Sequence, residues 1–374
     1  MNCDEKNTLL SQGNIDRDDL WPKIKEYENA RYQFRFEFGL SFADLPQKPG
    51  LITIRGARQT GKSTWMELAL LQTIEDFGKG TAFLLNGDEI YSHSEFQEKL
   101  LGFEASFRKS AKIKRVFIDE ITAIPDWQRV FKRLVDSGHL KDVLIVTTGS
   151  NAADIRHASE RLPGRKGKLA RGDYLFLPIS YKEYLYQTRG EIGTFPRDSL
   201  FGYFLTGGSP VAVSEMAADD KLSDNFVTLV KDWLIGAIAE SGRSRIFALS
   251  LIRKLFDHGA SRVSFTKLAR EAGLANNSAA LDYIEKLVDL CAIMVCPQWD
   301  HQKKTYLQKK ASKIQFINLA VASAFHPNSY RYLDELRRQE GQTKAAFYEW
   351  VVAQELWRRE NLRNQLKNVA YGPI

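Results

Sequence analysis

The sequence predicts an α/β fold with a parallel β-sheet, followed by a smaller α+β region. Two observations predict the sheet. A glycine-bearing loop at residues 56–61 separates an apolar, β-branched run from a run of helix-forming residues. Further strand-like runs then alternate with helical ones, which is typical of a parallel sheet with helices on both faces. A third observation, two helical patterns joined by a glycine-bearing turn near residue 273, predicts the α+β region.

The expected strands of the sheet are short apolar runs. They lie at residues 51–55, 81–86, 115–119, 143–148 and 174–177, with helical patterns at residues 94–107 and 126–137 between some of them. Sheets of this kind bind their ligands at the carboxyl ends of the strands. The segments that follow these strands are therefore where a functional site is expected.

Residues 56–64, GARQTGKST, fit the pattern G-x-x-x-x-G-K-[ST] in the strand, loop and helix context that the motif requires. Glycines let the backbone wrap closely around phosphates, and the loop amides and the helix N-terminus attract their negative charge. Lys62 would reach the β- and γ-phosphates, and the Ser63 hydroxyl would bind Mg²⁺. An ordinary glycine turn before a helix is the alternative. The predicted site for ATP consists of Gly56, Ala57, Arg58, Gln59, Thr60, Gly61, Lys62, Ser63 and Thr64.

A hydrophobic strand that ends in two acids, VFIDE at residues 116–120, is the expected companion of this loop. Asp119 would contribute to ATP binding by holding Mg²⁺ through water. Glu120 would orient and deprotonate an attacking water, which predicts hydrolysis rather than binding alone. At the tip of the next strand, two residues could form a hydrogen bond with the γ-phosphate or the attacking water. Ser150 is the first candidate and Thr148 the second. A plain turn after the strand is the alternative there.

Composition and charge narrow the class of protein. The chain has 374 residues, 44% of them hydrophobic and 26% charged, which is typical of a globular protein with two or three domains. No apolar stretch approaches membrane-spanning length, and the N-terminus lacks the order of a secretory signal. The 3 cysteines provide neither a disulfide framework nor a zinc site. We therefore expect a cytoplasmic protein without a membrane partner, whose net charge of +7 permits a polyanionic one.

Several segments, in their order and spacing, resemble those of the prokaryotic AAA+ ATPases. They are GARQTGKST, RVFIDE, TTGSN, RLPGR and LPISYKEYL. More narrowly, the chain is similar to the group whose C-terminal region is labelled DUF4143. The resemblance implies ATP at an interface between subunits, with Arg165, or as second choice Arg161, acting on a neighbour's γ-phosphate. For the segment around Arg165, the alternative is a solvent-exposed basic turn without a catalytic role. The resemblance also suggests that Asn86 tethers Glu120.

Two departures limit what the resemblance implies. The lid stretch at residues 203–211, YFLTGGSPV, has no arginine where many relatives carry a second sensor, which favours a slow switch over rapid turnover. The helix expected at residues 343–359 resembles the opening helix of a restriction-endonuclease-like fold. Because no later cluster of carboxylates and a lysine follows it, we predict no nuclease activity and interpret residues 331–374 as the remnant of a nuclease-like domain.

The region after residue 245 has the pattern of a winged helix. A helix at residues 246–256 has an expected apolar stripe of Ile246, Leu249, Ile252 and Phe256. The remaining elements are expected helices at residues 264–274 and 277–290 and strands at residues 292–296 and 313–317. In such a domain the second of the two paired helices enters the major groove of DNA, and a basic wing contacts phosphate. The residues expected to make these contacts are Asn276, Asn277, Ser278, Lys286, His301, Lys303 and Lys304.

The sequence therefore predicts an ATPase core at residues 1–180, a helical lid at 181–244, a winged helix at 245–330 and a C-terminal helical segment at 331–374. The predicted function is hydrolysis of ATP with Mg²⁺, coupled to DNA or a DNA-bound partner, in a homo-oligomer or with a partner protein. The alternative is a regulatory ATPase switch that controls the docking of another protein without DNA contact. A small-molecule phosphotransferase is disfavoured because Glu120 beside Asp119 suits the activation of water.

Overall fold

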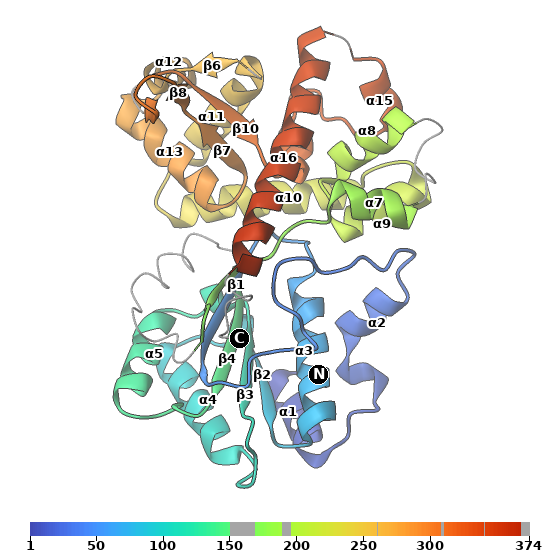
Figure 1. Cartoon of the computed structure of the whole chain (residues 1–374), viewed down its shortest axis with the longest axis vertical. Coiled ribbons are helices and arrows are strands. Elements are labelled where there is room, and N and C mark those ends of the chain that lie inside the picture. Colours follow the sequence, from blue (N-terminus) through green and yellow to red (C-terminus); the bar gives the residue numbers. More distant parts are fainter. Residues whose placement is uncertain (150–168, 189–195, 260, 308–309, 340, 368–374) are drawn as a thin grey trace. The chain divides into compact units, whose positions relative to one another are not determined.

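The computed structural model describes residues 1–149, 169–188, 196–259, 261–307, 310–339 and 341–367 (Figure 1). Two compact units make up the chain. The first contains residues 1–57, 61–177 and 361–374, and the second contains residues 58–60 and 178–360. Each unit buries aromatic and aliphatic side chains of its own.

The first unit is built on a five-stranded parallel sheet with the strand order β2-β3-β4-β1-β5. The strands are β1 (Gly50–Arg55), β2 (Ala82–Asn86), β3 (Arg115–Asp119), β4 (Leu144–Gly149) and β5 (Asp173–Leu175). The parallel pairing confirms the predicted fold class, and the strands lie close to the residues that the sequence predicted. Strands β2 and β5 are each one residue shorter than expected, and β5 ends at Leu175 instead of residue 177.

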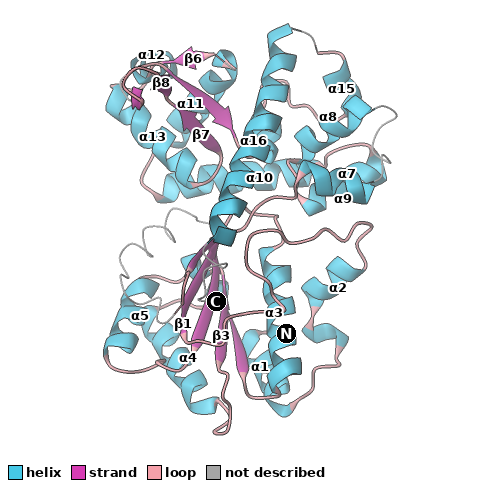
Figure 2. Cartoon of the chain, viewed as in Figure 1, coloured by secondary structure: helices cyan, strands magenta, loops and turns pink. Residues whose placement is uncertain are grey.

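Helices cover both faces of this sheet (Figures 1 and 2). One face carries α4 (His93–Ser106) and α5 (Trp127–Asp136), and the other carries α3 (Lys62–Phe77). Val116 and Ile118 of β3 join the hydrophobic cluster beneath α4 and α5. Phe117, which lies between them and is also buried, falls on the opposite face because side chains alternate along a strand. The strands are apolar almost throughout for this reason: both faces of the sheet are buried.

The N-terminal segment contains the short helices α1 (Cys3–Gln12) and α2 (Pro22–Glu28) and covers the edge strand β2. Asn7 pairs with the backbone of Leu84 as a neighbouring strand would: its Nδ2 donates to the Leu84 carbonyl at 2.6 Å, and its Oδ1 accepts the Leu84 N–H at 2.8 Å. Glu67 of α3 binds Lys6 Nζ at 3.0 Å and accepts two backbone N–H groups at the start of α2. The two Asn7 hydrogen bonds satisfy the backbone of Leu84, which an open edge would expose to other chains.

Most of the second unit is helical. Apart from those of the α+β region described below, its helices are α7 (Tyr181–Thr188), α8 (Pro196–Thr206), α9 (Pro210–Asp219), α10 (Asp224–Glu240), α14 (Leu319–Phe325), α15 (Leu333–Arg337) and the part of α16 (Gly341–Lys367) up to residue 360. Phe204 of α8 packs on Phe347 of α16 with 4.5 Å between the ring centroids. Arg337 of α15 binds the buried Asp198 carboxylate of α8 at 2.7 Å. None of the helices among the described residues, α16 included, combines the length and the hydrophobicity that a bilayer crossing requires.

A small α+β region lies within the second unit. In chain order its elements are α11 (Arg245–His258), β6 (Arg262–Val263), α12 (Phe265–Ala272), α13 (Asn277–Asp289), β7 (Ile293–Cys296), β8 (Gln298–Asp300), β9 (Thr305–Leu307) and β10 (Ser312–Phe316). Three strands form an antiparallel sheet in the order β6-β10-β7, and β8 and β9 form a separate hairpin. Helix α12 is capped at both ends: Ser264 accepts the Lys267 N–H, and Gly273 has a left-handed backbone with φ 75°.

The apolar stripe predicted for α11 is wrong in its first half. Ile246 is 77% exposed and Leu249 is 48% exposed, although Ile252 is buried as predicted. The side chains of α11 that face the core are Ala248, Leu251, Ile252 and Leu255. Apolar residues occupy several sides of this helix, so that a stripe at helical spacing can be drawn along more than one face. The packing of α11 on α12, α13 and α10 decides which of these faces is buried.

Candidate functional site

The loop predicted to bind phosphate follows β1 and leads into α3. Gly61 has a left-handed backbone with φ 101° and caps α3, which begins at Lys62. Lys62 is only 5% exposed, and its Nζ donates to the carbonyl oxygens of Gly56 at 3.1 Å and Ala57 at 2.7 Å. The ammonium group is therefore held within the curve of the loop, next to a helix N-terminus whose backbone N–H groups attract an anion.

Neither glycine of this loop has room for a side chain. A Cβ on Gly56 would lie 2.8 Å from the carbonyl oxygen of Phe176, and a Cβ on Gly61 would lie 3.1 Å from Cε1 of Phe36. The rings of Phe36 and Phe176 are 5.9 Å apart, and Tyr27 packs on Phe36 at 5.6 Å. The aromatic run at residues 32–36 was the only sequence signal of this packing. The sequence predicts that this run packs beside the nucleotide site, but the individual contacts of Phe36 and Phe176 with the loop depend on the tertiary fold.

The two acids at the end of β3 lie beside a threonine of β4. Thr148 Oγ1 donates a hydrogen bond to Asp119 Oδ1 and accepts the backbone N–H of Glu120 at 3.3 Å. Glu120 has φ 47°, a left-handed backbone that is uncommon for residues other than glycine. Thr148 therefore orients the Asp119 carboxylate and supports the sharp turn at Glu120. Sequence analysis ranked Ser150 above Thr148, and Ser150, like Arg161 and Arg165, lies outside the described residues.

The neighbouring strand β2 places Asn86 opposite Asp119 in the register of the sheet. Asn86 Oδ1 accepts the N–H of Asp88 at 3.2 Å and so caps the short 3-10 turn η2 (Gly87–Glu89). The suggested tether between Asn86 and Glu120 stays a prediction. Gly87 lies against the backbone of the catalytic candidate, because a Cβ there would be 2.1 Å from the carbonyl oxygen of Glu120.

Replacing Gly87 with alanine is therefore expected to destabilise the fold by about 1–3 kcal/mol, because the added methyl group meets backbone that cannot swing aside. ATP turnover should fall as well, since the displaced backbone carries Glu120. Gly102→Ala is the matched control, because nothing lies within 4 Å of a Cβ at Gly102 in α4. Urea unfolding measures the stability, and phosphate release measures the turnover. Equal stability of the two variants would contradict the close approach at Gly87.

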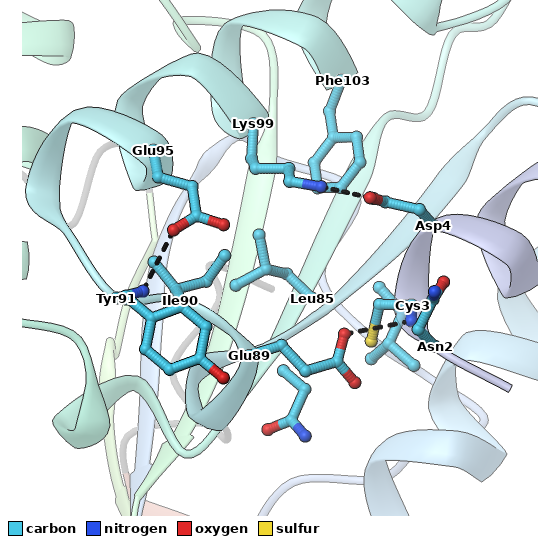
Figure 3. A pocket seen from close by; sticks show the side chains of 12 residues that line it. Asn2, Cys3, Asp4, Leu85, Glu89, Ile90, Tyr91, Glu95, Lys99 and Phe103 are labelled. Carbon is cyan, nitrogen blue, oxygen red and sulfur yellow. Dashed lines mark hydrogen bonds and ion pairs between the residues drawn. The ribbon is translucent and has the colours of Figure 1, made fainter.

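A cavity of about 260 Å³ lies beside β2, at the N-terminus of α1 (Figure 3). Two of its carboxylates accept backbone N–H groups: Glu95 binds Tyr91 at 3.0 Å, and Glu89 binds Cys3 at 3.1 Å. Burial raises the pKa of the Cys3 thiol to about 12, so that this thiol is neutral at pH 7. No residue of the phosphate loop lines the cavity. Its carboxylates, Asp4, Glu89 and Glu95, do not suit a phosphate.

The residues at the loop and at the strand ends fit ATP and Mg²⁺. The glycine backbone, the Lys62 ammonium and the N-terminus of α3 offer the donors that phosphate oxygens require. Ser63 lies in the first turn of α3, and the Asp119 carboxylate lies at the end of β3. A hydroxyl and a carboxylate are oxygen ligands of the kind that Mg²⁺ prefers.

The residues predicted to contact DNA divide into an exposed group and one buried residue. Asn276 caps α13 by accepting the Ala279 N–H at 2.9 Å, so its side chain has a structural role as well. The prediction that Lys286 contacts DNA is wrong, because this residue is only 7% exposed and lies on the core-facing side of α13. The exposed candidates are Asn276, Asn277 and Ser278 at the start of α13, and His301, Lys303 and Lys304 in the turn between β8 and β9.

The part of the chain that carries the loop and both acids matches a known family. Residues 48–185 match the family model of an AAA domain. This AAA domain spans the phosphate loop and all five strands of the parallel sheet. A comparison with curated proteins finds no match to the chain.

Several solved structures are similar to the chain at low identity. A Walker-type ATPase of Pyrococcus abyssi matches at 14% identity with a TM-score of 0.49, over 83% of this chain and 95% of that chain. The ORC2 protein of Aeropyrum pernix matches at 12% identity with a TM-score of 0.41, over 94% of each chain. RuvB of Thermotoga maritima matches at 12% identity with a TM-score of 0.34, over 70% of this chain and 85% of that chain.

Proposed function

We propose that the AAA domain of this chain binds ATP with Mg²⁺ and hydrolyses ATP, and that the α+β region couples the nucleotide state to DNA or a DNA-bound partner. The observation that carries the proposal is the arrangement at the carboxyl ends of β1 and β3. There the Lys62 loop and the pair Asp119 and Glu120 belong to one parallel sheet. A loop alone would suggest binding, whereas the loop together with a second, adjacent acid suits hydrolysis.

Each of these side chains has a task in the proposed reaction. Lys62 exchanges the carbonyl oxygens of Gly56 and Ala57 for phosphate oxygens, which carry charge and are stronger acceptors. Asp119, oriented by Thr148, would hold Mg²⁺, and Glu120 would accept the proton of the attacking water. When bound, Mg²⁺ neutralises the charge that develops on the phosphates. The loop then positions the γ-phosphate relative to Glu120.

Finer parts of the proposal rest on the sequence. In an oligomer, Arg165 of one subunit acts on the γ-phosphate bound by its neighbour, which makes assembly a condition for full turnover. The C-terminal part of the second unit is of the DUF4143 type, and its α+β region acts as a winged helix. We propose that the exposed residues at the start of α13 meet bases and that Lys303 and Lys304 meet phosphates, as this class of domain does.

A second candidate is supported by the exposed face of α11. Ile246, Phe247 and Leu249 are 77%, 40% and 48% exposed, and they follow one another closely at the start of this helix. Apolar side chains gathered on a surface favour contact with another protein. On this alternative, the nucleotide state controls the docking of a protein partner at α11 without any contact to DNA.

The two candidates are separated by measuring ATP turnover with and without duplex DNA over a range of salt concentrations. The proposed function predicts turnover that rises with DNA, with an effect that falls steeply as salt displaces the lysines from phosphates. Lys303→Ala with Lys304→Ala should flatten that salt dependence by about 0.9 units of the logarithmic slope for each phosphate that is no longer neutralised. Turnover indifferent to DNA, together with a protein partner that no longer binds Leu249→Asp, would support the alternative instead.

A further inference from the structure

The hairpin of β8 and β9 carries two large aromatic side chains in solvent. Trp299 is 41% exposed and Tyr306 is 60% exposed. They face each other directly across the two strands, with ring centroids 4.9 Å apart and ring planes at 69°. The hairpin forms a two-stranded sheet of its own, separate from the sheet of β6, β10 and β7. The pair therefore stabilises the hairpin, but nothing in the described part of the chain covers it.

Trp299 differs from the other tryptophans. The chain has 7 of them, and Trp357 is half-buried. The remaining tryptophans are at most 7% exposed: Trp21, Trp65, Trp127, Trp233 and Trp350. A lone tryptophan on a surface would need no explanation, but here it stands beside an exposed tyrosine at the base of a charged turn.

The turn between the two strands is basic and fixed in shape. The Asp300 carboxylate accepts the backbone N–H groups of Gln302 at 2.9 Å and Lys303 at 3.0 Å, and Lys304 has a left-handed backbone with φ 48°. Lys303 and Lys304 are exposed, and neither forms an ion pair with any of the residues described. The hairpin thus places two cations close to an exposed aromatic pair.

We propose that this hairpin, residues 298–307, binds single-stranded nucleic acid, with an unpaired base stacked on Trp299 and flanked by Tyr306, and its backbone phosphates on Lys303 and Lys304. The combination of base stacking and phosphate neutralisation is what recognition of a single strand requires. Paired bases in a duplex are already stacked on each other. A duplex would therefore contact the lysines through its phosphates, without stacking a base on either ring. The inference deepens the proposed function, on whose DNA contact it rests, by naming the class of nucleic acid.

The test uses the full chain and compares a labelled thymidine oligonucleotide with a duplex of the same length, by fluorescence anisotropy. Trp299→Ala is expected to weaken binding of the single strand about 5- to 100-fold, which is the range for loss of one stacked base. Trp299→Phe keeps a ring and should restore most of the affinity. Binding should also quench tryptophan emission in the wild type, but not in Trp299→Phe. Tyr91→Ala removes an exposed ring elsewhere and should change nothing.

The duplex arm separates a stacking role from a structural one. If the hairpin remains intact, the Trp299 variants bind the duplex as the wild type does, while Lys303→Ala with Lys304→Ala weakens both ligands. Equal losses for single strand and duplex in Trp299→Ala would show that the pair only holds the hairpin together, and would overturn the inference. Unchanged binding of the single strand would overturn it too, although duplex binding would still support the proposed function. Binding of neither ligand would remove both this inference and the DNA part of the proposed function.

Discussion

Replacing Glu120 with glutamine should leave ATP bound and reduce its hydrolysis by about 100- to 10,000-fold, the contribution usual for a general base. An amide cannot accept the proton of the attacking water, whereas it matches the carboxylate in size. The backbone at this position, with φ 47° and its N–H on Thr148, should tolerate glutamine as it tolerates glutamate. Single-turnover hydrolysis and equilibrium binding of ATP, measured on the same preparation, separate the chemical step from affinity.

Glu89→Gln is a suitable control for this experiment. Glu89 lies in the 3-10 turn after β2 and accepts the backbone N–H of Cys3, which the oxygen of a glutamine can also accept. Its turnover should match that of the wild type. Undiminished hydrolysis by Glu120→Gln would remove Glu120 from the role of base, and loss of ATP binding in that variant would mean that Glu120 contributes to the binding site instead.

Replacing Lys62 with alanine should weaken ATP binding by about 10- to 100-fold or more, since a hydrogen bond to a charged group contributes about 1.5–3 kcal/mol. The substitution removes the cation that the loop holds and leaves the carbonyls of Gly56 and Ala57 without this donor. Arginine should not replace lysine, because its planar guanidinium group is larger and the site is only 5% exposed. Titration calorimetry with ATP and Mg²⁺ measures the affinity.

Lys79→Ala is the matched control for Lys62→Ala. Lys79 follows α3, is exposed, and donates only a long bond of 3.4 Å to the Gln12 carbonyl. Its loss should change neither affinity nor turnover. Wild-type affinity in Lys62→Ala would contradict the assignment of the loop to phosphate.

The sheet and the loop could be predicted from the sequence because their signals are local. Strands buried on both faces are apolar throughout, and the motif at residues 56–64 specifies its own strand and helix. The contacts of Phe36 with Gly61 and of Phe176 with Gly56 could not be predicted in this way, because only the fold brings these residues together. The bond between Thr148 and Asp119 depends likewise on two strands becoming neighbours.

Errors in the α+β region have a different cause. Helix α11 has apolar residues on several sides, so spacing alone placed Ile246 and Leu249 in the core, although both are exposed. Because lysine usually lies on the surface, the residue type alone predicts an exposed Lys286, but its position on α13 faces the core. In both cases the residue types allow more than one orientation of the helix, and contacts with neighbouring helices select one.

Calorimetric titration of the folded wild-type chain with ATP in the presence of Mg²⁺ tests the central claim most directly. The account predicts saturable heat with one nucleotide per AAA domain, abolished or strongly weakened in Lys62→Ala and retained in Glu120→Gln. The account would be contradicted if the wild type gave no heat of binding and ATP displaced no fluorescent ATP analogue from it, in a preparation whose folding is verified by circular dichroism.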